Sequence, residues 1–123
     1  MFVFVYGSLK KDFKFHYLLE DQSIFIGEAK TLEKFSLFQY KNYDFPYMKD
    51  FPYKRIKGEL YEIDSKTLKD LDLLEGYPTF YDRKQIDIIC NNIKYSAYTY
   101  FLKEDIIEDK ESLEEWTLKD QLI

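Results

Sequence analysis

The chain has 123 residues, a length that fits one domain with a real hydrophobic core. Hydrophobic residues make up 46% of it and aromatic residues 20%, which excludes a disordered chain and favours an aromatic-rich core. The net charge of −5 argues against a nucleic-acid backbone as the main partner, and the single cysteine, Cys90, excludes an internal disulfide.

The N-terminal run Met1–Tyr6 is almost wholly apolar, as expected of a central strand buried on both faces. It ends at Gly7, whose conformational freedom suits a turn. The run is too short for a signal peptide or a membrane span, so we expect a cytoplasmic protein without membrane contact. Residues Lys14–Glu20 predict a short helix or turn.

Three further strands are predicted in the first half of the chain, at Ser23–Lys30, Leu32–Phe38 and Lys57–Ile63. Between the last two, Tyr40–Tyr53 contains two prolines and many aromatic residues but no clear period. It predicts a long loop, with or without one short edge strand, and loops of this length are often functional.

The segment Asp64–Leu74 predicts the clearest helix. Asp64 or Ser65 can cap its start, leucines recur along one side, and Gly76 suits a left-handed stop after the last turn. The helix therefore has a defined beginning, a buried face and a defined end.

The second half of the chain predicts a hairpin and a terminal helix. Gln85–Cys90 and Ile93–Phe101 flank Asn91-Asn92, a pair that favours a tight turn, and Ser112–Leu122 predicts a C-terminal helix. Many strands around one or two helices indicate a single α+β domain over residues 1–123, with a strongly curved or barrel-like sheet.

Glu75 is the first candidate for chemistry. It lies one helical turn beyond Leu71, inside the apolar stripe of the predicted helix. Burial disfavours the charged form, and the negative end of the helix dipole acts in the same direction, so both raise the pKa of this carboxyl toward neutrality. That suits proton transfer. The alternative is a glutamate that closes the helix and bonds to backbone or to a tyrosine.

The second candidate is Tyr6-Gly7-Ser8-Leu9. A buried strand that ends in a glycine-bearing turn exposes backbone N–H groups, which can bind a carboxylate or an oxyanion, although most such turns only reverse the chain. An Asp-His-Ser relay could be built from Asp12, His16 and Ser8, but only their closeness in sequence supports it. No cluster has metal-ligand spacing, and no glycine-rich phosphate motif occurs.

A cluster of three lysines, Lys10, Lys11 and Lys14, follows this turn. We interpret the cluster as a solvated edge, with attraction of an anionic substrate as the alternative.

Four motifs in order resemble the gamma-glutamyl cyclotransferase-like superfamily, closest to its gamma-glutamylamine cyclotransferase and AIG2-like branch. They are Phe4-Val5-Tyr6-Gly7-Ser8-Leu9, Phe45-Pro46-Tyr47, Gly58-Glu59-Leu60-Tyr61-Glu62-Ile63-Asp64, and Leu71 to Pro78 followed by Tyr81-Asp82-Arg83. The resemblance spans Phe2 to Tyr100. It implies a small mixed β-barrel with flanking helices.

The resemblance also implies an activity. The α-amine of a small gamma-glutamyl substrate attacks its own γ-carbonyl, which gives 5-oxoproline and a free amine or amino acid without cofactor or metal. Glu75 acts as general acid/base, and the backbone of Gly7, Ser8 and Leu9 binds the carboxylate or oxyanion. Tyr6 and Tyr81 are pocket walls or hydroxyl donors. Arg83 supports the loop or, alternatively, contacts substrate.

Several points stay open. A hydrolase or acyl-exchange enzyme could use the same pocket, and so could a non-catalytic module that binds a small ligand. The sequence departs from the family pattern at Asp12 and Phe15, where many relatives carry Gly and Asn, which leaves the substrate open. Tyr98 and Tyr100 can face either the pocket or the core. The leaving group is undetermined, and a monomer is the default oligomeric state.

Overall fold

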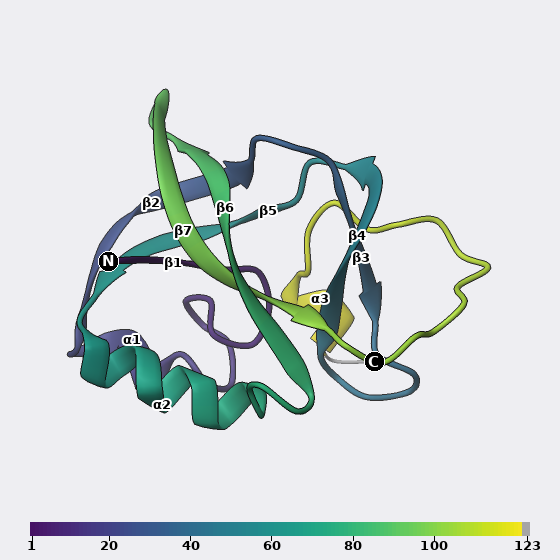
Figure 1. Ribbon diagram of the computed structural model, residues 1–123, viewed down its shortest axis with the longest axis horizontal. Coiled ribbons are helices and arrows are strands. Elements are labelled where there is room, and N and C mark those ends of the chain that lie inside the picture. Colours follow the sequence, from purple (N-terminus) through teal and green to yellow (C-terminus); the bar gives the residue numbers. More distant parts are fainter. Residues whose placement is uncertain (122–123) are drawn as a thin grey trace.

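The computed structural model describes residues 1–121. Five strands form a closed barrel in the order β1–β5–β2–β6–β7 (Figure 1). Their bounds are Phe2–Val5 for β1, Lys57–Ile63 for β5, Ser23–Thr31 for β2, Tyr81–Cys90 for β6 and Ile93–Leu102 for β7. The β1–β7 pair is parallel and the other neighbouring pairs are antiparallel. The predicted α+β fold with a small mixed barrel is therefore confirmed.

Strand β1 is buried on both faces, as its continuous apolar sequence predicts. Val3 and Phe4 are fully buried and Val5 is 3% exposed. Val3 and Val5 pack into one hydrophobic cluster and Phe4 into a second, because successive side chains of a strand point to opposite sides. The strand thus fixes the start of the segment that follows it, Tyr6–Leu9.

Two helices, α1 (Tyr17–Glu20) and α2 (Ser65–Glu75), lie side by side along one side of the barrel (Figure 1). The predicted caps of α2 are confirmed. The carboxylate of Asp64 accepts a 2.8 Å hydrogen bond from the Thr67 amide, and Gly76 is left-handed with φ 66° and ψ 32°. The helix therefore stops directly after Glu75.

Strands β3 (Phe35–Gln39) and β4 (Pro46–Lys54) form a separate antiparallel pair. The prediction of a long loop over Tyr40–Tyr53, with at most one short edge strand, is wrong in extent, because the nine-residue strand β4 occupies most of it. Its first three residues are all buried and the next part is exposed, so no alternating pattern marks the strand. Pro46 is its first residue, a position where proline costs no ladder hydrogen bond.

The predicted C-terminal helix over Ser112–Leu122 is also wrong in extent. Only α3 (Leu118–Gln121) is helical, and Leu122 lies outside the described residues. The segment before α3 follows an irregular path past β3 and β4 (Figure 1) and bonds to other elements, as in the 2.8 Å bond from the Leu113 amide to the Leu37 carbonyl. Its backbone groups are satisfied outside a helix.

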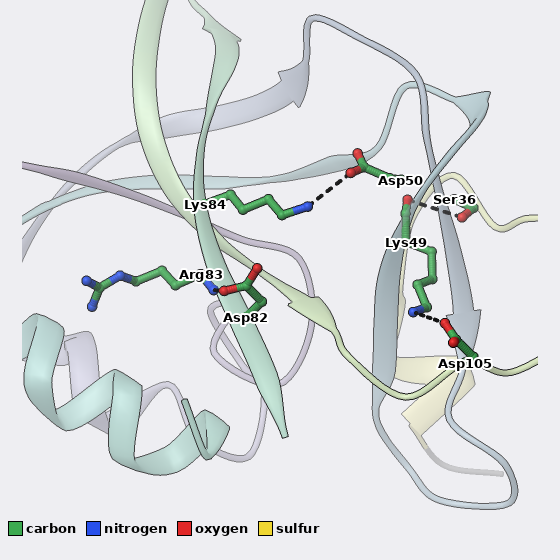
Figure 2. Close-up of polar contacts among 7 residues, drawn as sticks. All are labelled: Ser36, Lys49, Asp50, Asp82, Arg83, Lys84 and Asp105. Atoms are coloured by element: carbon green, nitrogen blue, oxygen red, sulfur yellow. Dashed lines mark hydrogen bonds and ion pairs between the residues drawn. The ribbon is translucent and has the colours of Figure 1, made fainter. Parts of the chain in front are cut away.

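The hairpin of β6 and β7 turns at Asn91 and Asn92, both with positive φ, which confirms the predicted tight turn. Strand β6 begins at Tyr81, four residues before the predicted start. Figure 2 shows that β6 is also linked to β4, through a 3.0 Å ion pair between Lys84 and Asp50.

Candidate active site

A cavity of about 230 Å³ is formed where β1 stops and α2 ends. Five parts of the chain build it: the end of β1 with the segment after it as far as Phe15, the loop into β4, the end of α2, the start of β6, and β7. The lining includes all six residues that the sequence nominates, which are Tyr6, Gly7, Ser8, Leu9, Glu75 and Tyr81. The volume lies below the roughly 300–1,000 Å³ of sites for drug-sized ligands, so the cavity suits a small ligand.

Glu75 reaches the cavity from the last turn of α2. Its side chain keeps some exposed surface because it faces the cavity, while protein surrounds it on the other sides. Burial raises the pKa of the Glu75 carboxyl from its ordinary 4.5 to about 7. A carboxyl with this pKa is present in both protonation states at neutral pH, as a proton shuttle requires.

The segment after β1 presents free backbone donors. Within residues 1–121, no hydrogen bond joins the amide N–H of Gly7, Ser8 or Leu9 to a protein acceptor, whereas the carbonyls of Gly7 and Ser8 are bonded to later residues of the loop. We call these three residues the amide cradle. All three residues line the cavity, and unbonded backbone N–H groups in a turn of this kind can bind an anion.

Gly7 is needed for a different reason from the one its sequence context suggests. Its φ is not in the positive region, so conformational freedom is not the requirement. A Cβ at this position would lie 2.8 Å from Cγ and 2.9 Å from Cδ of Pro46. The absent side chain therefore lets β4 approach the amide cradle and close the cavity.

The loop after the amide cradle accommodates the two departures from the family pattern. Asp12 has a φ of 73°, the left-handed region that glycine adopts most easily and aspartate tolerates. Phe15 lines the cavity, and its amide donates to the Ser8 carbonyl at 2.8 Å. His16 Nδ1 lies 2.9 Å from the Leu9 carbonyl, so this histidine is bonded to the cradle backbone and not to a serine hydroxyl.

Three tyrosines form the wall around Glu75. The hydroxyl of Tyr6 donates to the Tyr100 carbonyl at 2.8 Å, and that of Tyr81 donates to the Pro46 carbonyl at 3.0 Å. Burial raises the pKa of Tyr6 and Tyr81, and the nearby charge of Glu75 adds to it. Tyr100, which sequence reasoning left undecided, lines the cavity as well. All three phenols stay neutral and fixed by hydrogen bonds.

Arg83 does not line the cavity, which favours its predicted supporting role over substrate contact. Its guanidinium pairs with Asp72 of α2, and the other oxygen of Asp72 accepts a 2.7 Å hydrogen bond from Tyr100. The guanidinium also stacks on the rings of Tyr77 and Tyr98. Figure 2 shows the side chain of Arg83 extending from β6 away from the side on which Lys84 meets β4. The network joins the end of α2 to the β6–β7 hairpin.

The interpretation of the lysine cluster as a solvated edge is wrong for Lys10. This side chain is only 6% exposed, and its ammonium donates to the backbone carbonyl of Trp116. Lys11 and Lys14 are exposed as predicted.

The charged residues that line the cavity are Asp44 and Glu75, and the lining contains no lysine, arginine or histidine. An anionic ligand therefore depends on backbone N–H groups and on the Ser8 hydroxyl, because the three tyrosine hydroxyls donate to protein acceptors. Within residues 1–121, no group of three or more His, Cys, Asp or Glu side chains is placed to hold a metal ion. In the same part of the chain, no helix has the length and apolar character needed to cross a membrane.

Comparison with known proteins gives one consistent family. The model of the family described as gamma-glutamyl cyclotransferase, AIG2-like, matches residues 3–118. A protein of Methanocaldococcus jannaschii with the provisional name gamma-glutamylcyclotransferase is 45% identical over 105 residues, which cover 84% of this chain and 85% of that protein.

Two vertebrate proteins extend this likeness. The gamma-glutamylaminecyclotransferase of Rattus norvegicus is 35% identical over 92 residues, which cover 70% of this chain and 62% of the rat protein. The crystal structure of an AIG2-like protein from Mus musculus superposes with a TM-score of 0.86 at 25% identity, and it covers 94% of this chain and 87% of that one. Sequence and fold therefore give the same result.

Proposed function

The chain belongs to the gamma-glutamyl cyclotransferase, AIG2-like family and is a cyclotransferase, and we propose that it converts a gamma-glutamyl amine or gamma-glutamyl amino acid to 5-oxoproline and a free amine. The observation that carries this proposal is the pairing in one small cavity of a carboxyl with a pKa near 7, Glu75, and three free backbone N–H groups. The first suits proton transfer and the second suits an anion.

In the proposed reaction the nucleophile belongs to the substrate. The α-amine attacks the γ-carbonyl carbon, a new C–N bond closes the five-membered ring, and the original γ-amide C–N bond breaks. Glu75, as carboxylate, accepts a proton from the α-ammonium group, and as carboxylic acid it passes that proton to the leaving nitrogen. The attacking nitrogen loses its second proton to Glu75 as the lactam forms, and the carboxyl then releases that proton to solvent. Holding the substrate folded with its amine near its γ-carbonyl supplies much of the acceleration.

The amide cradle is the proposed site for the negative charge of the substrate, either its α-carboxylate or the oxyanion that develops at the γ-carbonyl. Gly7, Ser8 and Leu9 supply the donors. The cavity lining holds no basic side chain that could compete for this role. Tyr6 and Tyr81 form the wall, with their hydroxyls already bonded to backbone carbonyls.

The test is product identity. Purified protein is incubated in H₂¹⁸O with gamma-glutamyl amino acids, gamma-glutamyl-ε-lysine and other gamma-glutamyl amines, and products are identified by mass spectrometry. We expect 5-oxoproline without solvent oxygen in its ring carbonyl, because cyclisation does not use water. The panel member that is consumed identifies the leaving group.

The alternatives give different results in the same experiment. Glutamate that carries ¹⁸O in its γ-carboxyl would indicate a hydrolase, and transfer of the gamma-glutamyl group to another amine would indicate acyl exchange. No turnover by folded protein that still binds panel members would indicate a binding module. Any of these outcomes would contradict the proposed reaction.

A further inference from the structure

Lys10 is a buried cation that the proposed reaction does not use. It directly follows the amide cradle, and its own amide donates to the Gly7 carbonyl at 3.0 Å, which closes the turn that carries the cradle. Its side chain is 6% exposed, lies against the ring of Phe13 at 4.9 Å and donates to the carbonyl of Trp116. The cation therefore joins the cradle turn to the C-terminal segment.

The partner of Lys10 is a neutral carbonyl. Among the described residues, no carboxylate forms an ion pair with its ammonium. Burial lowers the pKa of Lys10, against the opposing effect of the more distant charges of Glu115, Glu59, Asp120 and Glu28. Burying an unpaired ammonium is unfavourable, and a neutral donor could bond to the same carbonyl. The hydrogen bond to Trp116 therefore does not explain why a positively charged residue stands at position 10.

The C-terminal segment that carries the Trp116 carbonyl is itself well fixed. Trp116 is 1% exposed and belongs to a hydrophobic core cluster, and the nearby Glu114 carbonyl accepts a 2.8 Å hydrogen bond from the Lys57 amide of β5. Since backbone bonds hold the C-terminal segment to β5 of the barrel and to β3, the Trp116 carbonyl that Lys10 contacts is held in place. The hydrogen bond from Lys10 to this carbonyl therefore fixes the position of the turn that carries the amide cradle.

Within the described residues, the lining of the cavity lacks a positive charge that could attract the carboxylate of a substrate. A gamma-glutamyl substrate carries an α-carboxylate, yet the charged side chains in the lining, Asp44 and Glu75, are both acidic. Backbone amides supply only partial charges. A full positive charge on the residue that follows the amide cradle, shielded from solvent, strengthens the attraction of the cradle for an anion, because buried charges are screened far less than exposed ones.

We propose that Lys10 is a positioning residue for carboxylate recognition, which ties the turn that carries the amide cradle to the carbonyl of Trp116 and adds positive charge next to that turn. This inference rests on the proposed function, because it assigns the cradle to the substrate carboxylate. Lys10 acts through the cradle and does not touch the ligand, since it does not line the cavity.

Two probes test the inference without turnover. 5-Oxoproline carries the carboxylate, and 5-oxoprolinamide is its neutral counterpart. Their dissociation constants are measured by calorimetry for the wild type, Lys10→Met, Lys10→Gln, Lys10→Arg and the matched control Lys11→Met, whose lysine is the exposed neighbour. Thermal melting establishes that each variant is folded. The glutamine variant keeps a neutral donor for the Trp116 carbonyl, so it carries the test if the methionine variant does not fold.

We expect Lys10→Met to weaken binding of 5-oxoproline about 10- to 100-fold, the range for losing a charge-assisted interaction. Lys10→Gln should weaken 5-oxoproline binding less, and Lys10→Arg and Lys11→Met should stay within about threefold of the wild type. Binding of 5-oxoprolinamide should change little in Lys10→Gln.

Two results would overturn the inference alone: wild-type affinity for 5-oxoproline in folded Lys10→Gln and Lys10→Met, or equal weakening of both probes, which indicates a purely structural lysine. A wild type that binds neither probe would instead contradict the proposed function, and this inference with it.

Discussion

Replacing Glu75 with glutamine should stabilise the protein above neutral pH. Below pH 4.5 the carboxyl is protonated in the folded and the unfolded chain alike. Between 4.5 and about 7 the folded protein keeps a proton that the unfolded chain releases, so the free energy of unfolding falls as the pH rises. Above about pH 7 the carboxyl is ionised in both the folded and the unfolded chain, and the free energy of unfolding falls no further.

The size of this loss follows from the pKa. A rise from 4.5 to about 7 corresponds, at about 1.4 kcal/mol per pH unit, to about 3 kcal/mol. This is an upper limit, because solvent that enters the cavity screens the carboxylate. Glutamine has nearly the same shape and no charge, so Glu75→Gln should be up to about 3 kcal/mol more stable than the wild type at pH 8 and nearly equal to it at pH 4.5.

The assay is urea denaturation of both proteins at half-unit intervals between pH 4.5 and 8.5, with slopes compared to verify two-state unfolding. Glu62→Gln is the control, because Glu62 is exposed on β5 and its replacement should change stability by no more than about 0.5 kcal/mol. A difference between Glu75→Gln and the wild type that stays constant with pH, or that favours the wild type at pH 8, would refute the raised pKa.

Three further predictions concern the site and the helix that carries Glu75. Gly7→Ala should lower stability by about 1–3 kcal/mol in thermal or urea denaturation, because its Cβ meets Pro46, and Pro46→Ala in the same chain should recover part of the loss. Leu71→Ala should lower the free energy of unfolding by about 2–5 kcal/mol, because Leu71 is fully buried on the inner face of α2. Leu73→Ala, at an 81% exposed position of the same helix, should lower it by less than about 0.5 kcal/mol. Equal losses would contradict the docking of α2. In pH–rate measurements kcat/KM should rise through a limb near pH 7 as Glu75 ionises, and a limb near 4.5 would contradict burial as the control of its pKa.

Local patterns predicted those elements whose signals are themselves local. The caps of α2 depend on Asp64 and Gly76, and the turn between β6 and β7 depends on two adjacent asparagines, so each could be predicted within a few residues. Strand β4 could not, because Tyr47 and Met48 are both buried and erase the alternation that marks a half-exposed strand.

Long-range contacts explain the other differences. The segment before α3 carries a helical pattern, but its amides and carbonyls bond to β3 and β5, and tertiary contacts override a short helical preference. Lys10 belongs to a basic run, and only the position of Trp116, 106 residues later, shows that it is buried.

In the candidate site, too, some features could be predicted from local sequence and others could not. Glu75 and the amide cradle could be nominated from the helix stripe, the strand end and the resemblance of motifs. The packing of Gly7 against Pro46 and the contact of Tyr100 with Asp72 could not, because each joins residues far apart in the chain. Those contacts bring the nominated residues into one cavity.

The most direct test of the central claim is the rate at which Glu75→Gln releases 5-oxoproline, compared with the wild type at pH 8 on the substrate that the panel identifies. Thermal melting and substrate binding verify that the variant is folded with an intact pocket. If Glu75 transfers the proton, the rate should fall by about 10²- to 10⁴-fold while affinity changes little. A folded variant with an undiminished rate would contradict the assignment of Glu75 as general acid/base.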